Sequence, residues 1–294
     1  MANPEPLPAR PRQCILSLSM KRVLTAVVLI PIVLALVLLG PLWMLTAVTA
    51  AVAALAGWEF MGLAERVGAK PPRIAVLVAI LALFAGTFEY PDQATAVFGI
   101  LALGLLVYCT FSIRIDQVTA EASVSIFTLV YVGLTLTAIP ALRAESNGPS
   151  LVIFLMCVVW SGDTAALYVG RAWGRHKLAP TLSPNKTWEG SLGSVAGSLL
   201  VAGVLLGLAA LLEIWNSTKL SYSDDVWWYW LLLAVVVNVA AQLGDLAESA
   251  LKRSAGVKDS GDLLPGHGGI LDRIDALLLA APVMWYAQLI RQRF

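Results

Sequence analysis

The segment from Ser249 to Asp275 gathers many charged residues between two strongly apolar stretches of the chain. Ionised side chains are costly inside a membrane helix, so where they occur beside apolar spans they usually mark a functional site. Carboxylates next to lysine and arginine are the groups that bind a metal ion together with phosphates. The segment therefore predicts a phosphate and metal site. Its charged residues are Lys252, Arg253, Lys258, Asp259, Asp262, Asp272, Arg273 and Asp275.

Helical spacing predicts which of these side chains meet. Asp272 and Asp275 are three residues apart and share one face of the last apolar helix, while Asp245 lies near the end of the preceding one. Antiparallel neighbours place these charged ends on the same side, so we expect Asp245 to face Asp272. An alternative for Asp272 alone is that it stabilises the helix dipole. The residues that share the face of the preceding helix, at i, i+3, i+4 and i+7, are Asp245, Glu248, Ser249 and Lys252.

A second polar segment, Leu182–Gly190, precedes another apolar run. It contains Lys186, two hydroxyl side chains and Glu189 at a predicted helix start, where backbone N–H groups bind phosphate. Helix capping without ligand binding is the alternative interpretation. Asp163 lies inside a further apolar run and is a weaker candidate, either a site acid or a carboxylate hydrogen-bonded to neighbouring helices.

The elements that carry these residues are membrane helices. Hydrophobic residues make up 59% of the 294 residues, charged residues 13%, and mean hydropathy is +0.79, a composition that excludes an ordinary soluble domain. Runs of about 17–25 apolar residues are long enough to cross a bilayer. We expect an all-α polytopic membrane protein with about nine transmembrane helices, at roughly 23–39, 42–61, 73–88, 94–113, 124–142, 151–171, 191–213, 227–250 and 268–290.

This pattern divides the chain into a leader at 1–22, N-terminal transmembrane helices at 23–145 and a C-terminal catalytic region at 146–294. Glu59 and Glu65 in the N-terminal helices are interpreted as interfacial side chains. With nine spans and a cytoplasmic N-terminus, nearly all of the 20 lysines and arginines fall on the cytoplasmic side, together with both polar segments. The exceptions are Arg143, Lys219, Arg291 and Arg293.

The polar segments resemble a known family. The run Ser249-x-x-Lys-Arg-x-x-x-x-Lys-Asp-x-Gly-x-x-Leu-Pro-Gly-His-Gly-Gly-x-x-Asp-Arg-x-Asp275 is similar to the signature of phosphatidate cytidylyltransferases. The stretches Ser183–Gly190 and Gln242–Asp245 also resemble elements of that family. The similarity is specific in the C-terminal half, whereas the N-terminal half matches only as generic membrane helices.

The resemblance implies that phosphatidate reacts with CTP at the cytoplasmic face of the cell inner membrane, giving CDP-diacylglycerol and pyrophosphate, with Mg²⁺ as cofactor. It implies metal ligation by Asp245 and Asp272, and hydroxyl contacts to substrate from Ser183, Thr187 and Ser249. The implied phosphate clamps are Lys186, Lys252, Arg253, Lys258 and Arg273. The remaining residues implied to bind or orient substrate are Asn185, Glu189, Asp259, His267, Gly268, Gly269 and Asp275.

Two alternatives stay open at this point. One is a cytidylyltransferase that acts on another lipid phosphate, such as an archaeal-type ether lipid. The other is a transporter of a phosphorylated solute, although a transporter site is expected near the bilayer midplane. A second cation and a homodimer are also left open, and no nucleic-acid partner is expected.

Overall fold

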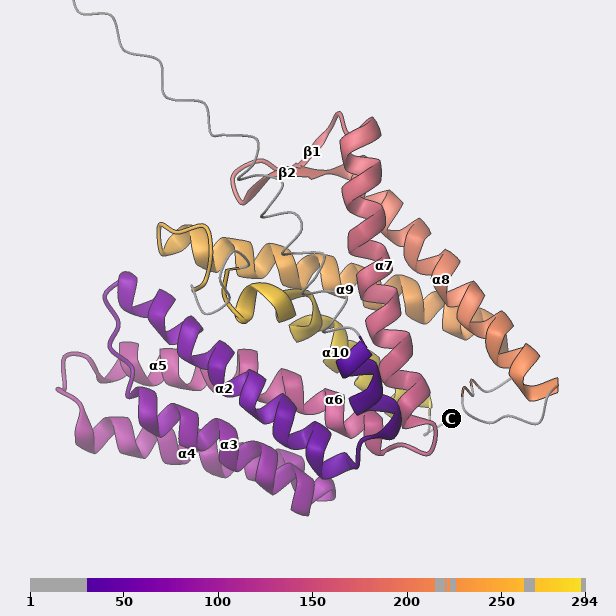
Figure 1. The fold of residues 1–294 in the computed structure, drawn as a ribbon. Coiled ribbons are helices and arrows are strands. Elements are labelled where there is room, and N and C mark those ends of the chain that lie inside the picture. The colour runs from indigo at the N-terminus through magenta and orange to yellow at the C-terminus, as the bar shows by residue number, and fades with distance from the viewer. Residues whose placement is uncertain (1–30, 215–219, 221, 223–225, 262–267, 292–294) are drawn as a thin grey trace, which may run out of the picture.

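The computed structural model describes residues 31–214, 220, 222, 226–261 and 268–291, and most of them are helical (Figure 1). The predicted all-α fold is thus confirmed. A 3₁₀ turn, η1 (Pro91–Gln93), precedes α4, and a π-helical segment, η2 (Leu129–Leu134), joins α5 to α6. After a helix at 31–39, the α-helices are α2 (Leu42–Arg66), α3 (Arg73–Glu89), α4 (Ala94–Ser112), α5 (Val118–Thr128), α6 (Thr135–Ala144), α7 (Gly148–Trp173), α8 (Trp188–Ile214), α9 (Trp227–Ser254) and α10 (Leu271–Arg291).

Seven helices in the described part of the chain are long and apolar enough to cross a membrane. They coincide with seven of the predicted spans, and the protein is a multi-pass membrane protein. The third predicted span corresponds to α3, which has only 17 residues. The first span is described only from residue 31, and the predicted leader at 1–22 lies outside the described residues. The count of nine spans is therefore not confirmed.

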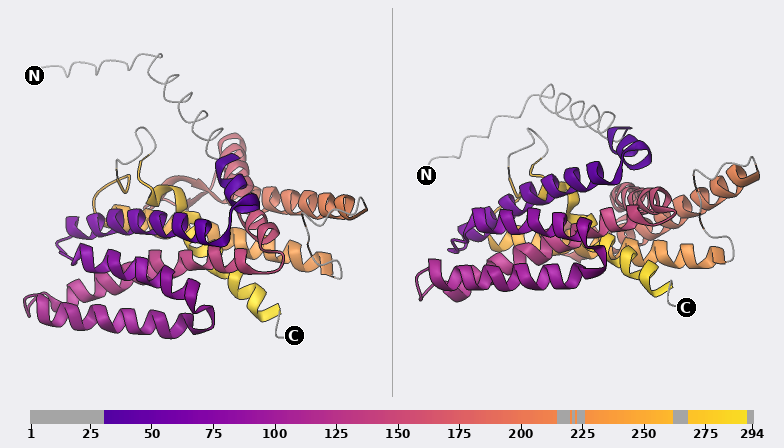
Figure 2. Two further views of the ribbon diagram at one scale, coloured as in Figure 1. Left: turned by 60° about the horizontal axis from the view of Figure 1, so that its bottom comes forward. Right: turned by 90° about the horizontal axis from the view of Figure 1, so that it is seen from below.

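Helix α10 lies between two groups of helices (Figures 1 and 2). Leu271 and Leu278 of α10 belong to the apolar core formed mainly by α2, α3 and the α5–η2–α6 helix. Ala280 and Met284, further along α10, belong to a second core formed mainly by α6 to α9. One helix thus contributes to both cores and holds the two halves of the chain together.

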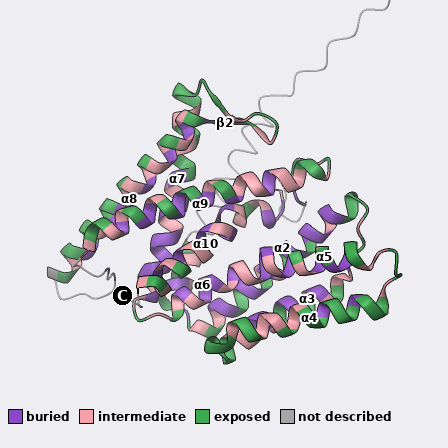
Figure 3. Ribbon diagram, turned by 180° about the vertical axis from the view of Figure 1, so that it is seen from behind, coloured by how far each residue is buried: buried purple, intermediate pink, exposed green. Residues whose placement is uncertain are grey.

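The surface of the helices is strongly apolar, as expected for contact with lipid. In α4 only 11% of the most apolar stretch is buried, and in α8 only 22%. Large side chains such as Ile100 and Leu103 on α4, and Leu192 and Leu200 on α8, are exposed. Figure 3 shows these exposed stretches along both helices. Lipid tails would cover such a surface at no hydrophobic cost.

Buried polar side chains fix α9 against α8. Ser191 Oγ donates to Gln242 Oε1 over 2.5 Å, and Gln242 Nε2 donates to Asn238 Oδ1 over 2.7 Å. The Asn238 amide also donates to Ser194 and Ser198 at 2.9 and 2.8 Å. Hydrogen bonds of this kind hold helices together in lipid. These hydrogen bonds fix how α9 is rotated about its own axis, one turn before the charged residues at its end.

A two-stranded hairpin connects α7 to α8. Its antiparallel strands are β1 (Lys177–Ala179) and β2 (Ser183–Thr187), with Lys177 opposite Thr187. The helix start predicted within residues 182–190 is confirmed at Trp188, where α8 begins, but the residues before it form β2, which was not predicted. Ser183 precedes Pro184, and a residue before proline favours extended backbone over helix. The polar segment before α8 is therefore mostly strand.

Candidate functional site

Three elements bring the predicted site residues together: β2, the last turns of α9 and the first turns of α10. On α9, Ser249 Oγ lies 3.5 Å from Asp245 Oδ1, and Lys252 forms an ion pair with Glu248 one turn away. These contacts place the four residues on one face of α9, as their spacing predicted. Lys252 also reaches α10, so the charged ends of the two helices do meet.

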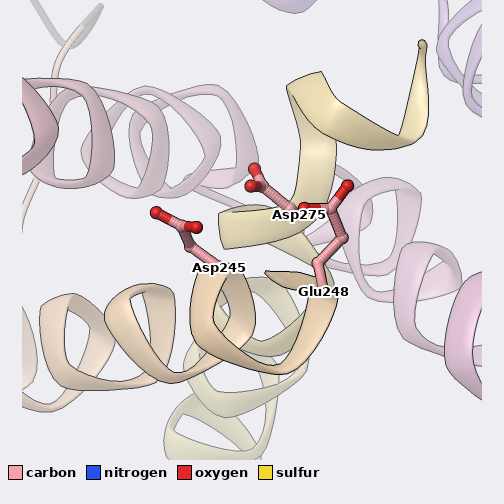
Figure 4. A group of neighbouring side chains, drawn as sticks. All are labelled: Asp245, Glu248 and Asp275. Atoms are coloured by element: carbon pink, nitrogen blue, oxygen red, sulfur yellow. The ribbon is translucent and has the colours of Figure 1, made fainter. Parts of the chain in front are cut away.

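Three carboxylates form a compact cluster at this junction. Asp245 and Glu248 come from α9 and Asp275 from α10 (Figure 4). One carboxylate oxygen from each residue lies within 4.8 Å of the other two. Opposite oxygens around an octahedral Mg²⁺ are about 4 Å apart. Small side-chain movements would therefore place all three on one hard cation, and the residues fit such an ion.

Asp272, which sequence reasoning paired with Asp245, makes different contacts. Its carboxylate accepts hydrogen bonds from the backbone N–H of Ser260 at 3.0 Å, the Ser260 hydroxyl at 3.0 Å and the Gly269 N–H at 2.8 Å. It also accepts a hydrogen bond from Lys252 Nζ at 2.6 Å. Asp272 thus caps the start of α10, which is close to the alternative weighed from sequence, while Asp275 occupies the place opposite Asp245.

Lys252 balances charge inside the cluster. Its side chain is only 12% exposed and forms ion pairs with both Glu248 and Asp272. The Glu248 carboxylate is fully buried, and its Oε1 has no hydrogen-bond partner among the described residues. A buried carboxylate oxygen without a partner is costly. A cation at the cluster would satisfy this oxygen.

Lys186 joins the hairpin to the cluster. Its Nζ lies 2.5 Å from Asp245 Oδ2, with both side chains partly exposed. Asp163 on α7 is also exposed and lies within electrostatic range of Asp245 and Lys186. The ammonium of Lys186 thus stands at the open side of the cluster, where an approaching phosphate would meet it.

The other predicted residues of the hairpin differ in their surroundings. Thr187 Oγ1 accepts the N–H of Gly190 at 3.1 Å and so caps α8. Glu189 accepts the N–H groups of Arg175 and His176 and contacts His176 Nδ1 at 2.6 Å. Thr187 and Glu189 thus stabilise the hairpin and its junction with α8. Ser183 is half-buried in β2 and Asn185 is exposed.

The remaining predicted residues surround the cluster. Arg253 donates to the Leu182 carbonyl at 3.3 Å and so connects α9 to the hairpin. Gly268 has φ +76°, and a β-carbon there would lie 2.6 Å from Asp272 Oδ2, so this position requires glycine. His267 lies outside the described residues. The side chains of three further predicted residues are exposed: Lys258, Asp259 and Arg273.

Two residues near the site were missed by sequence reasoning. Glu59 of α2 is 5% exposed and contacts the start of α10, although it was interpreted as interfacial. The prediction of a solvated or snorkelling side chain is wrong because Glu59 is buried, and an acid within an apolar span was the available signal. Tyr131 of η2 has a buried hydroxyl with no hydrogen-bond partner among the described residues, within electrostatic range of Asp245, Glu248 and Asp275. Its near neighbours in the sequence carry no ionisable side chain, so nothing in the sequence pointed to it.

The chain is similar to known proteins over most of its length. The model of the cytidylyltransferase family matches residues 20–290, which include all three elements of the site. The chain belongs to the cytidylyltransferase family. Within this family, a phosphatidate cytidylyltransferase of Bacillus subtilis is 31% identical over 271 residues, covering 90% of this chain and 96% of that protein.

Two further relatives carry the same name. A phosphatidate cytidylyltransferase of Brucella suis is 39% identical over 191 residues, covering 63% of this chain and 64% of that protein. One of Staphylococcus epidermidis is 34% identical over 212 residues, covering 72% and 75%. The match to the Brucella suis protein thus spans just under two thirds of its length.

Proposed function

We propose that the protein transfers CMP from CTP to phosphatidate, giving CDP-diacylglycerol and pyrophosphate in phospholipid biosynthesis. The observation that carries this proposal is the cluster of Asp245, Glu248 and Asp275 beside Lys186, in a chain of the cytidylyltransferase family. Carboxylates that hold Mg²⁺, next to a lysine that meets phosphate, are what nucleotidyl transfer requires.

In this reaction a phosphate oxygen of phosphatidate bonds to the α-phosphorus of CTP. The bond from that phosphorus to the bridging oxygen of the β-phosphate breaks, and pyrophosphate leaves with the electron pair. Phosphatidate is already ionised, so no strong base is needed. Mg²⁺, when bound, would supply positive charge to the phosphate oxygens.

The chain's own residues have three tasks in this scheme. Asp245, Asp275 and Glu248 would hold the metal ion, and Lys252 shares its one positive charge between Glu248 and Asp272. Lys186 leaves Asp245 to contact the charge that develops on the phosphates. The exposed side chains around the carboxylate cluster add positive charge that attracts CTP. They include Arg253, Lys258 and Arg273.

The function is tested with the purified protein in detergent micelles, given CTP, Mg²⁺ and phosphatidate. We expect CDP-diacylglycerol and pyrophosphate in equal amounts, no product after EDTA treatment and recovery when Mg²⁺ is restored. Glycerol 3-phosphate and an ether-lipid phosphate serve as comparison acceptors. Release of pyrophosphate without a lipid product, or full activity in EDTA, would overturn the proposal.

We also propose that the site faces the cytoplasm, where CTP is available, from the cell inner membrane. In a cysteine-free background, a Lys177→Cys variant in the exposed hairpin should resist membrane-impermeant thiol reagents until the cytoplasmic face is opened. An Asp92→Cys variant in the exposed turn between α3 and α4 should react from outside. The reverse labelling pattern would contradict the proposed orientation.

A further inference from the structure

Glu59 connects the N-terminal helices to the charged segment of the C-terminal half. It lies in α2 and is buried, yet its carboxylate has three donors from residues more than 200 positions later. Glu59 Oε1 accepts the backbone N–H of Ile270 at 3.0 Å, and Oε2 accepts that of Leu271 at 2.8 Å. The Ser260 hydroxyl lies 3.1 Å from Oε2 and shares its single proton between Glu59 and Asp272. The carboxylate thus contacts both flanks of residues 262–267.

The backbone around Glu59 is fitted to this carboxylate. A β-carbon at Gly261 would lie 2.7 Å from Glu59 Oε1, and all three of its nearest atoms would belong to Glu59. A β-carbon at Gly269 would collide with Glu59 and with Ser260 Oγ. Two glycines of the charged segment are therefore needed because this glutamate lies against them.

Glu59 and Asp272 together complete the start of α10. The first N–H groups of a helix have no partner within the helix. Here Glu59 accepts the N–H groups of Ile270 and Leu271, and Asp272 accepts that of Gly269, just before the helix. Removing the Glu59 carboxylate would leave two of these buried groups without their acceptor. Asp275 follows in the next turn of α10, so the position of the first turn sets the place of Asp275 in the carboxylate cluster.

We propose that Glu59 is a positioning residue for nucleotidyl transfer, which fixes the first turn of α10 and thereby holds Asp275 opposite Asp245. The expected loss of kcat rests on the proposed function, whereas the expected loss of metal affinity does not. It gives the N-terminal half a direct part in the site.

The test compares Glu59→Gln with Glu121→Gln. Glu121 is a matched control because it is also a buried glutamate of the N-terminal half whose carboxylate accepts a backbone N–H. Its donor is Lys70, at 2.6 Å, in the loop between α2 and α3, which contributes none of the predicted site residues. Residues that support metal ligands typically contribute about 10–100-fold to metal affinity or activity. We expect Glu59→Gln to weaken Mn²⁺ binding, measured by electron paramagnetic resonance, and to lower kcat by such a factor.

Glu121→Gln should leave both quantities close to wild type, even if both variants melt at a lower temperature. Glu59→Asp, which keeps the charge at a shorter reach, should recover part of the kcat. Equal Mn²⁺ affinity and kcat in Glu59→Gln and wild type would overturn the inference. If wild type makes no CDP-diacylglycerol but Glu59→Gln still weakens Mn²⁺ binding, the proposed function fails and the positioning role stands.

A double-mutant cycle tests the contact itself. Gly261→Ala should lower kcat in the wild type because the new methyl group meets Glu59. In a Glu59→Ala background the same substitution should have a much smaller effect, since the obstructing carboxylate is gone. Independent effects of the two substitutions would contradict the contact, whereas strong coupling supports it.

Discussion

Asp245→Asn is expected to lower kcat by at least about a thousandfold, which corresponds to about 4 kcal/mol of transition-state stabilisation. Asp245 is the residue shared by the carboxylate cluster and the Lys186 ion pair. An amide would remove one negative charge from the metal site and also release Lys186 from its partner. Turnover is measured as CDP-diacylglycerol formed in the presence of saturating Mg²⁺ and CTP.

The variant should still fold and be extracted in normal yield. A neutral amide is cheaper to bury than an ion, and the lost ion pair is partly exposed and so contributes little to stability. Asp116→Asn provides the control, since Asp116 forms an exposed pair with Arg114 away from the site. Near-normal turnover in Asp245→Asn would remove Asp245 from the metal site.

Lys186→Ala is expected to lower kcat about a hundredfold, or about 2.7 kcal/mol. Its ammonium stands at the open side of the cluster and is the group that we expect to meet charge developing on the phosphates. Lys186→Arg should recover only part of the activity, because a planar guanidinium does not replace a compact ammonium at the phosphates. Initial rates over a range of CTP concentrations separate kcat from KM.

Lys177→Ala is the matched control for this substitution. Lys177 is an exposed lysine at the start of the same hairpin. Its removal should change neither constant by more than about twofold, as is usual for an exposed surface position. If Lys186→Ala raised the KM for CTP and left kcat intact, Lys186 would serve ground-state binding rather than the transition state.

Much of the fold could be predicted from the sequence, because long apolar runs in a membrane protein have few alternatives to helix. The same holds for the face of α9 that carries Asp245 and Lys252, since helical spacing alone fixes it. Spacing also predicted that Asp272 and Asp275 share a face of α10. Spacing could not decide which of the two would approach Asp245 on α9. Two residues three apart lie on nearly the same side of a helix, and the backbone before α10 determines which of them faces α9.

The contacts that the sequence did not reveal join distant parts of the chain. Glu59 meets Leu271 across more than 200 residues, and neither local pattern nor charge spacing carries such a pairing. The hairpin was missed for a different reason. Its residues include the Ser183-Pro184 step, which favours extended backbone, but the segment was interpreted only as the start of the helix that follows it.

The place of α10 between two cores has a consequence for biosynthesis. Helices are made in chain order, and α10 follows all the other described spans. Until it inserts, the surfaces that receive Leu271 and Met284 have no partner, and Glu59 has none of its donors from the start of α10. A nascent chain that has released α2 to α9 into the membrane therefore holds an incomplete site. The proposed site is therefore complete only after α10 has docked.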